Sequence, residues 1–228
     1  MKLSLSTARQ KSLQPLMVMV LVILLPTLLS SHLGAVPIIE NLFPSISTEY
    51  AQKLQLIMVG LLICVGIIVW RLGSRKAVLK IILGYTMIAT FMLAASLLFL
   101  IINLNSYGPS QALTLMKDGL VIWWMTALTF SLWYWLLDSG WAENMGMHDT
   151  KRSDFAFPQH MNELQGWKEW TPNHIDYLYL GFNTNTAFSP TDVMPLSPRA
   201  KILMMAQSTL ALIVVGTVVA RALSILLS

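Results

Sequence analysis

A short polar segment near the C-terminus carries the side chains of this chain that could do chemistry. It has the sequence NTNTAFSPTDVMP over residues 183–195. Hydroxyl and carboxylate oxygens can replace part of the hydration shell of a cation, and a carboxylate also concentrates cations near it. The candidate pore-lining residues are therefore the hydroxyl-bearing side chains and the acid of this segment: Thr184, Thr186, Ser189, Thr191 and Asp192.

The elements that must position these side chains are a short apolar stretch before them and a long one after them. Fifteen uncharged residues lie between Asp176 and Asp192. This is fewer than the ~20 residues of a spanning helix and is typical of a re-entrant or interfacial segment. The pattern of 176–182, DYLYLGF, predicts a short helix, and the Thr-rich part predicts a turn. Pro190 and Pro195 end any helix, and Pro198 suits the start of the last one.

Three interpretations of this segment stay open at this stage. Residues 183–198 could form an extramembrane turn, 177–195 could form a re-entrant loop that lines a polar path, or 177–191 could cross the membrane as a sixth span. Non-helical backbone at membrane depth must be buried in protein or line water. An unpaired buried carboxylate is costly, so we expect Asp192 to accept hydrogen bonds from nearby donors.

The composition predicts an integral membrane protein. Of 228 residues, 55% are hydrophobic and 11% are charged, and the mean hydropathy is +0.63. Five uncharged runs of 17 or more residues occur, at 12–39, 54–70, 81–116, 119–137 and 202–220. We expect an all-α, multi-pass membrane protein with five transmembrane helices and a short re-entrant or interfacial helix before the last. The helices are expected at about 15–36, 54–72, 79–103, 119–138 and 200–226.

These helices divide the chain into three predicted regions. Residues 1–138 form a four-helix membrane region, 139–173 a cytoplasmic or interfacial linker, and 174–228 the candidate pore loop with the last helix. The first apolar stretch could be a signal peptide, but it is long enough to span, and an uncleaved helix with a kink at Pro26 is favoured.

The distribution of Lys and Arg predicts a cytoplasmic N-terminus and insertion in the inner membrane. With five alternating spans, twelve basic residues lie inside and three outside. The outer three are Lys53, Lys117 and Arg221. Arg221 is expected to extend to the outer interface. The basic residues are spread over short segments, which does not indicate a nucleic-acid partner.

Tryptophans and polar residues mark two of the predicted helices. The fourth helix and its exit carry Trp123, Trp124, Trp133, Trp135 and Trp141, a pattern that favours an interfacial aromatic belt with packing. The last helix carries Gln207, Ser208 and Thr209, which favours an interior or subunit-facing position over lipid contact.

No enzyme signature is present in the sequence. There is no Ser-His-Asp order with a nucleophile elbow, no Gly-rich phosphate loop and no HExxH motif. His and acidic residues between 148 and 176 could supply metal ligands, but loop His and Asp are usually solvated. We expect no catalysis, no metal and no cofactor. The residues concerned are His148, Asp149, His160, Glu163, His174 and Asp176.

The order of elements over 170–226 resembles the pore module of potassium-type channels. A short aromatic helix leads into a Thr-rich turn, an Asp, a Pro and a long apolar helix. In that family a pore helix precedes a TTVGYGD filter and the inner helix follows it. Thr184 and Thr186 resemble the entrance threonines, Asp192 the acid after the filter, and Pro195 the following proline.

The resemblance implies cation permeation through an oligomeric pore, with the fourth helix as the outer helix and a tetramer as the assembly. AFSPT stands where VGYG would, so the glycine filter is missing and selectivity among monovalent cations should be poor. The whole chain is also similar to bacterial multi-pass membrane proteins of unassigned function. The alternative to a channel is a structural or accessory membrane protein without transport.

Overall fold

The computed structural model describes residues 5–31, 33, 35–72, 75–138, 153–161, 170–186 and 192–227, and these residues are mostly helical. The N-terminal elements are α1 (Leu5–Leu24), the 3-10 turn η1 (Leu25–Leu28), α2 (Val36–Leu42), α3 (Thr48–Leu72) and α4 (Arg75–Ile102). After the turns η2 (Leu104–Ser106) and η3 (Pro109–Gln111) follow α5 (Ala112–Asp138), β1 (Phe155–Ala156), α7 (Pro158–Met161), α8 (His174–Thr186), β2 (Met194–Pro195) and α9 (Pro198–Leu226). The predicted all-α class is confirmed.

Four helices of the described chain are long and apolar enough to cross a membrane. They cover Thr48–Arg71, Ala77–Ile102, Pro109–Asp138 and Pro198–Ile225. A shorter apolar helix covers Gln14–Leu28. Many large apolar side chains point outward, Leu61 and Phe91 among them, whereas Asp118 and Gln207 are fully buried. Apolar surface around buried polar groups is the arrangement that a lipid environment favours.

Three predicted helices match the structure closely, and two differ. The helix expected at 119–138 begins at Ala112, because Lys117 and the buried Asp118 lie within it instead of flanking it. The helix expected at 15–36 ends as an α-helix at Leu24. Pro26 lacks a backbone donor, and there the chain continues as a 3-10 turn, consistent with the predicted break in the helix.

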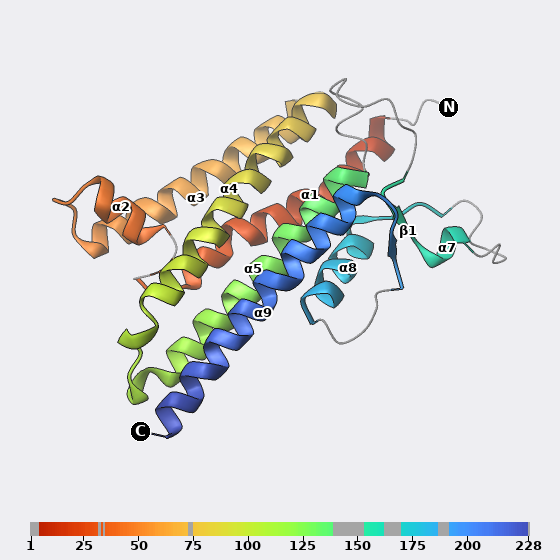
Figure 1. Ribbon diagram of the computed structural model, residues 1–228. Coiled ribbons are helices and arrows are strands. Elements are labelled where there is room, and N and C mark those ends of the chain that lie inside the picture. The colour runs from red at the N-terminus through yellow and green to blue at the C-terminus, as the bar shows by residue number, and fades with distance from the viewer. Residues whose placement is uncertain are drawn as a thin grey trace.

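Helices α5 and α9 run side by side along the molecule, and the short α8 lies next to the first half of α9 (Figure 1). Helix α4 packs on α5, and α3, with α2 at its end, lies furthest from α9 (Figure 1). The end of α3, the start of α4, the end of α5 and the start of α9 gather at one end of the molecule. Helix α8 therefore lies among the C-terminal helices of the bundle, next to α5 and α9.

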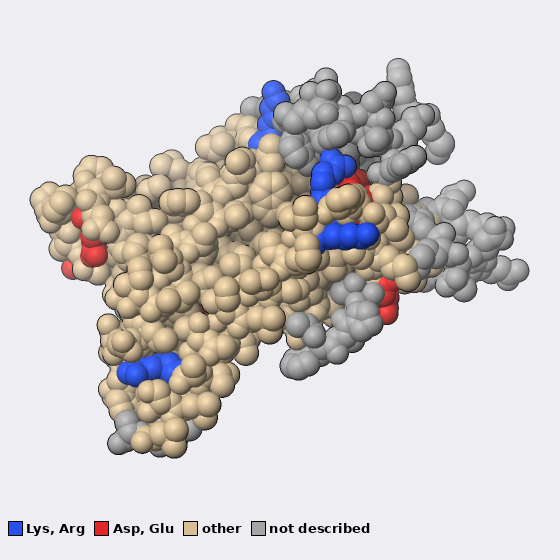
Figure 2. Space-filling model, in the orientation of Figure 1, with Lys and Arg blue, Asp and Glu red and all other residues tan. Residues whose placement is uncertain are grey.

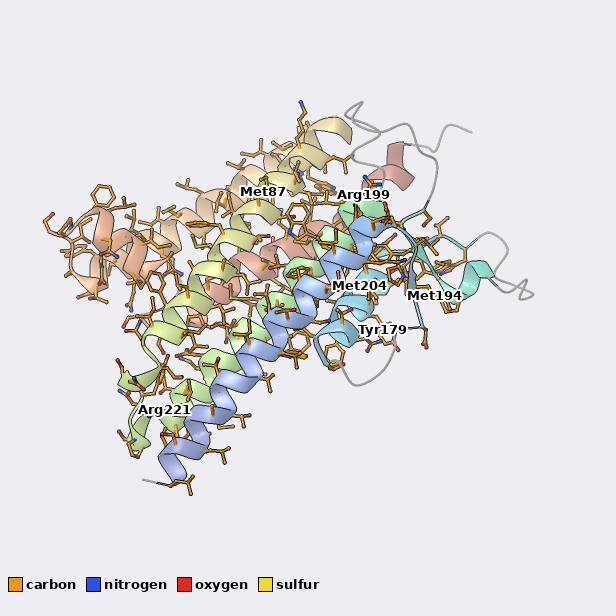
Figure 3. All side chains as sticks on the ribbon, in the orientation of Figure 1. Met87, Tyr179, Met194, Arg199, Met204 and Arg221 are labelled. Carbon is orange, nitrogen blue, oxygen red and sulfur yellow. The ribbon has the colours of Figure 1, made fainter. Side chains whose placement is uncertain are left out.

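Charged side chains lie toward the two ends of the molecule, and a broad uncharged surface separates them on the visible face (Figure 2). Arg199 and Arg221 mark the opposite ends of α9 (Figure 3). Between them α9 carries no charged residue apart from Lys201, near its start. Spanning helices present an uncharged surface of this kind to lipid.

Candidate functional site

Helix α8 enters the bundle at the Asp138 end of α5 and runs antiparallel to α5. Near its start, the Tyr177 hydroxyl donates to Asp138 Oδ2 at 2.6 Å. Near its end, Asn185 Nδ2 donates to the Trp123 carbonyl at 2.8 Å. Trp123 precedes Asp138 by fifteen residues of α5, which is about 22 Å along the helix axis. The inner end of α8 therefore lies near the middle of α5.

The chain after α8 returns to the end at which α8 began. Strands β1 and β2 pair antiparallel, with Phe155 opposite Pro195. The Leu196 amide donates to the Asp154 carbonyl at 2.8 Å, and the Asp154 amide donates to Asp138 Oδ1 at 2.9 Å. The first residues of α8 and the described residues 194–196 thus lie toward the same end of α5, an arrangement that a re-entrant segment would have.

The two faces of α8 have opposite character. Ile175, Tyr179 and Phe182 point outward and are 63%, 52% and 37% exposed. The buried face carries His174, Thr184 and Asn185 as well as Tyr177, Leu180 and Gly181. A helix with apolar residues outside and polar residues inside is suited to lipid, whereas a water-facing helix has the reverse pattern.

Helix α8 lies unusually close to α5 at Gly181. A Cβ at this position would come within 2.7 Å of the Ala127 carbonyl oxygen and 3.5 Å of Ser131 Cβ. Only glycine leaves room for the backbones at this separation. The close approach explains why a glycine stands at 181, among the large side chains of 177–182.

A buried glutamine of α9 connects all three helices of this region. Gln207 Nε2 donates to the Gly181 carbonyl at 2.6 Å and to Asn185 Oδ1 at 2.7 Å, and the Tyr134 hydroxyl donates to Gln207 Oε1. The Ser208 hydroxyl donates weakly to the Thr184 carbonyl at 3.4 Å. The sequence predicted an interior position for this part of α9. The sequence did not predict which residues of α5 and α8 bond Gln207.

The predicted site residues fall into three groups. Thr184 and Thr186 belong to α8, so the turn expected at this point is wrong: the helix continues, and their hydroxyls donate to the carbonyls of Leu180 and Asn183. Thr184 is buried. Asp192 was expected to accept hydrogen bonds because a buried carboxylate needs donors. In the structure its side chain is exposed, so this reason does not apply. Ser189 and Thr191 lie outside the described residues.

The start of α8 is closed by side chains of α1 and α5. The His174 amide donates to Gln14 Oε1 at 3.0 Å, and its Nε2 lies 3.3 Å from the Ser131 hydroxyl. Its Nδ1 has no hydrogen-bond partner within the described chain. Burial lowers the pKa of His174 to about 4, so the ring is neutral at pH 7. Burial and the Asp138 carboxylate raise the pKa of Tyr177, which keeps its hydroxyl as a donor.

A second polar cluster lies at the opposite end of α5. Asp118 is fully buried and accepts from the Ser30 amide at 3.1 Å, the Ser30 hydroxyl at 2.6 Å and the Tyr107 hydroxyl at 2.9 Å. Arg221 donates to the Tyr107 carbonyl from Nε at 3.0 Å and from Nη2 at 2.6 Å. Arg221 therefore holds the 104–108 turn against α9. Sequence analysis missed Asp118, because its partners lie 88 and 11 residues away.

Two further expectations concern tryptophan and metal. Trp123 and Trp124 lie near the middle of α5 and pack on Phe182 with ring centroids 5.4 and 5.7 Å away, so the predicted packing is present for these two, and the interfacial belt stays a prediction. Within the described residues, no group of three or more His, Cys, Asp or Glu could hold a metal ion. His148, Asp149 and Glu163 lie outside those residues.

Comparison of the chain with protein-family models, curated proteins and solved structures gives no match.

Proposed function

We propose that several copies of this chain assemble into a channel-like membrane protein, in which cations permeate past the inner end of α8. The position of α8 carries the proposal: the Tyr177 hydroxyl and Leu196 lie at the Asp138 end of α5, and Asn185, eight helical residues or about 12 Å from Tyr177, bonds Trp123 near the middle of α5. This is the path of a re-entrant helix flanked by an outer helix, α5, and an inner helix, α9.

The electrostatics of α8 support attraction of a cation. A helix C-terminus carries about half a negative charge, and in α8 this end points into the span. Thr186 is half-buried there, and the exposed carboxylate of Asp192 stands on the returning chain. Ser189 and Thr191 lie between them in sequence and remain part of the predicted lining. A single copy offers one wall of a path, so we propose a homo-oligomer, a tetramer by resemblance to pore-module channels.

The proposed setting is the inner membrane of a bacterial cell, with five spans and a cytoplasmic N-terminus. The shorter apolar helix, Gln14–Leu28, is the fifth span in this proposal. The Asp138 end of α5 then faces the cytoplasm, and α8 enters from that side. Reporter fusions at residues 45, 76, 110, 155 and the C-terminus should alternate between the two sides. A fusion at 155 that reports the outside would contradict the orientation.

A second candidate is a structural or accessory membrane protein. The bonds of α8 favour it: Thr184 donates within its own helix, and Asn185 is bound to Trp123 and Gln207. These side chains are occupied inside one chain and are not free to contact an ion. In this alternative, α8 only packs.

Cation flux into liposomes that contain the purified protein separates the two candidates. We expect flux with little discrimination among monovalent cations, and a lower flux for Asp192→Asn. Glu49→Gln is the matched control, since Glu49 is an exposed carboxylate that pairs with Lys53 on α3. Tight liposomes under every cation gradient, or a monomer both in detergent and in bilayers, would leave the accessory protein as the function.

A further inference from the structure

We infer that Gln207 is a positioning residue, which fixes the depth and the rotation of α8 between α5 and α9. The inference concerns how α8 is held and does not depend on whether ions pass. The Gln207 side chain is fully buried, and both of its donor directions and one acceptor direction are used. Its amide bonds Tyr134 of α5 together with Gly181 and Asn185 of α8.

The bonds of Gln207 are directional, whereas most other contacts of α8 are not. In lipid, apolar side chains gain little from leaving the solvent, so helix association depends on close packing and interhelical hydrogen bonds. The contact of Gly181 with the Ala127 carbonyl limits which face of α8 can lie against α5, but it supplies no attraction between α8 and α9. A buried polar side chain that must be satisfied supplies that attraction and fixes its direction.

Two asparagines make the rotation of α8 a real choice. Asn183 and Asn185 are two residues apart, which places them about 200° apart around the helix. In the structure Asn185 is buried, with its Oδ1 on Gln207 and its Nδ2 on the Trp123 carbonyl, and Asn183 is only half-buried. A turned α8 would offer the other amide to α9.

Gln207 can act in this way because α9 is itself fixed along α5. At its start, Arg199 Nη2 lies 3.5 Å from Asp154 Oδ1. Toward its end, Val218 packs on Gly119, where a Cβ would come within 2.5 Å of Val218 Cγ2. Arg221 then binds the Tyr107 carbonyl. Held at both ends, α9 presents Gln207 at one height, and α8 takes its depth from it.

Disulfide cross-linking between α8 and α9 tests the inference. In a Cys64→Ser background, the pair Thr184→Cys with Ser208→Cys joins neighbouring positions of the two helices, because the Ser208 hydroxyl lies 3.4 Å from the Thr184 carbonyl. The pair Phe182→Cys with Ser208→Cys reports the turned helix, because the rotation that brings Asn183 to the place of Asn185 brings residue 182 to the place of 184. We expect Gln207→Met to lower the ratio of the first cross-linking rate to the second about tenfold, the effect of about one buried hydrogen bond.

Gln55→Met is the matched control, since Gln55 is a buried glutamine of α3, away from α8, and its replacement should leave the ratio unchanged. Tyr134→Phe removes one of the three bonds and should lower the ratio about threefold, which also serves if Gln207→Met does not fold. An unchanged ratio in folded Gln207→Met or Tyr134→Phe protein, or an equal fall in Gln55→Met, would overturn the inference. Absence of cation flux together with a shifted ratio would remove the proposed function and leave the inference standing.

Discussion

The helices α5, α8 and α9 are joined by hydrogen bonds between side chains in their interior, whereas α3 meets its neighbours mainly through apolar side chains. Tyr134, Asn185 and Gln207 form the first kind of contact. Between α3 and α4, Tyr85 donates to the Leu62 carbonyl. A helix that crosses completely satisfies its own backbone, but α8 ends beside the middle of α5, inside the bundle, so protein must supply partners for its end. Polar bonding is concentrated where the chain departs from simple crossing.

The glycines of the two regions differ in the same way. A Cβ at Gly60 of α3 or Gly84 of α4 would meet nothing within 4 Å of the described structure. At Gly119 and Gly181, on α5 and α8, it would meet Val218 or a backbone carbonyl at 2.5 and 2.7 Å. Glycine is required at Gly119 and Gly181 and merely tolerated at Gly60 and Gly84, whereas Gly66 of α3, with Met19 Cε at 3.1 Å, and Gly216 of α9, with nothing within 4 Å, do not follow the division.

The largest effect should come from the buried carboxylate of α5. Asp118→Leu leaves the Tyr107 hydroxyl and the Ser30 donors without an acceptor, so we expect a loss of about 4 kcal/mol in the free energy of unfolding. Asp118→Asn keeps one acceptor and should lose less. At the exposed Asp192 the Asn and Leu variants should behave alike. Thermal unfolding in detergent measures all four, and equal stability of Asp118→Leu and Asp192→Leu would contradict the contrast.

The second-largest loss of stability is expected for Gly181→Ala. The added methyl meets the Ala127 backbone, which cannot move aside as a flexible side chain can. We expect a loss of about 3 kcal/mol. Gly60→Ala is the matched control and should be neutral or stabilising by up to ~1 kcal/mol, since alanine favours a helix. If both substitutions had the same effect on unfolding, the close approach of α8 to α5 would be refuted.

A smaller loss in the free energy of unfolding is expected when the pH falls, because of His174. The pKa of His174 is about 4 in the folded chain, below its ordinary value of 6.5, so the unfolded state binds more protons between these values. Stability due to this residue is therefore present above about pH 6.5 and is lost as the pH falls toward 4. Between about pH 7 and about pH 5 the loss is about 2 kcal/mol. His174→Gln should show a shallower slope over this range. An unchanged slope would place His174 in a solvated position.

The membrane class and the positions of α3, α4 and α9 could be predicted, because an uncharged run long enough to span is a local property of the sequence. The start of α5 could not. Lys117 and Asp118 break the apolar run, and only the folded chain brings Ser30 and Tyr107 to Asp118. Charges read as flanking a helix can lie within it when distant partners satisfy them.

The candidate segment, 183–195 with the short helix before it, could be predicted only in part, because its hydrogen-bond partners also lie far away in the sequence. Its short helix was indicated by the aromatic and aliphatic pattern of 176–182, and α8, His174–Thr186, contains these residues. The polarity of Asn183, Thr184 and Asn185 predicted a turn, because these residues disfavour helix interiors on propensity alone. Tertiary bonds to Gln207 and Trp123 outweigh that preference, and their geometry is invisible in a single sequence.

Side-specific labelling of single cysteines in sealed vesicles tests the re-entrant path of α8 most directly. In a Cys64→Ser background, a membrane-impermeant thiol reagent is applied from each side to Ser153→Cys, Asn173→Cys, Tyr179→Cys and Asp192→Cys. The account predicts that the cysteines at 153, 173 and 192 react from one and the same side, and that the one at 179, which faces lipid, does not react. Reaction at 173 and 192 from opposite sides would make α8 part of a sixth span, and ready reaction at 179 would place α8 on the membrane surface; either result would contradict the account.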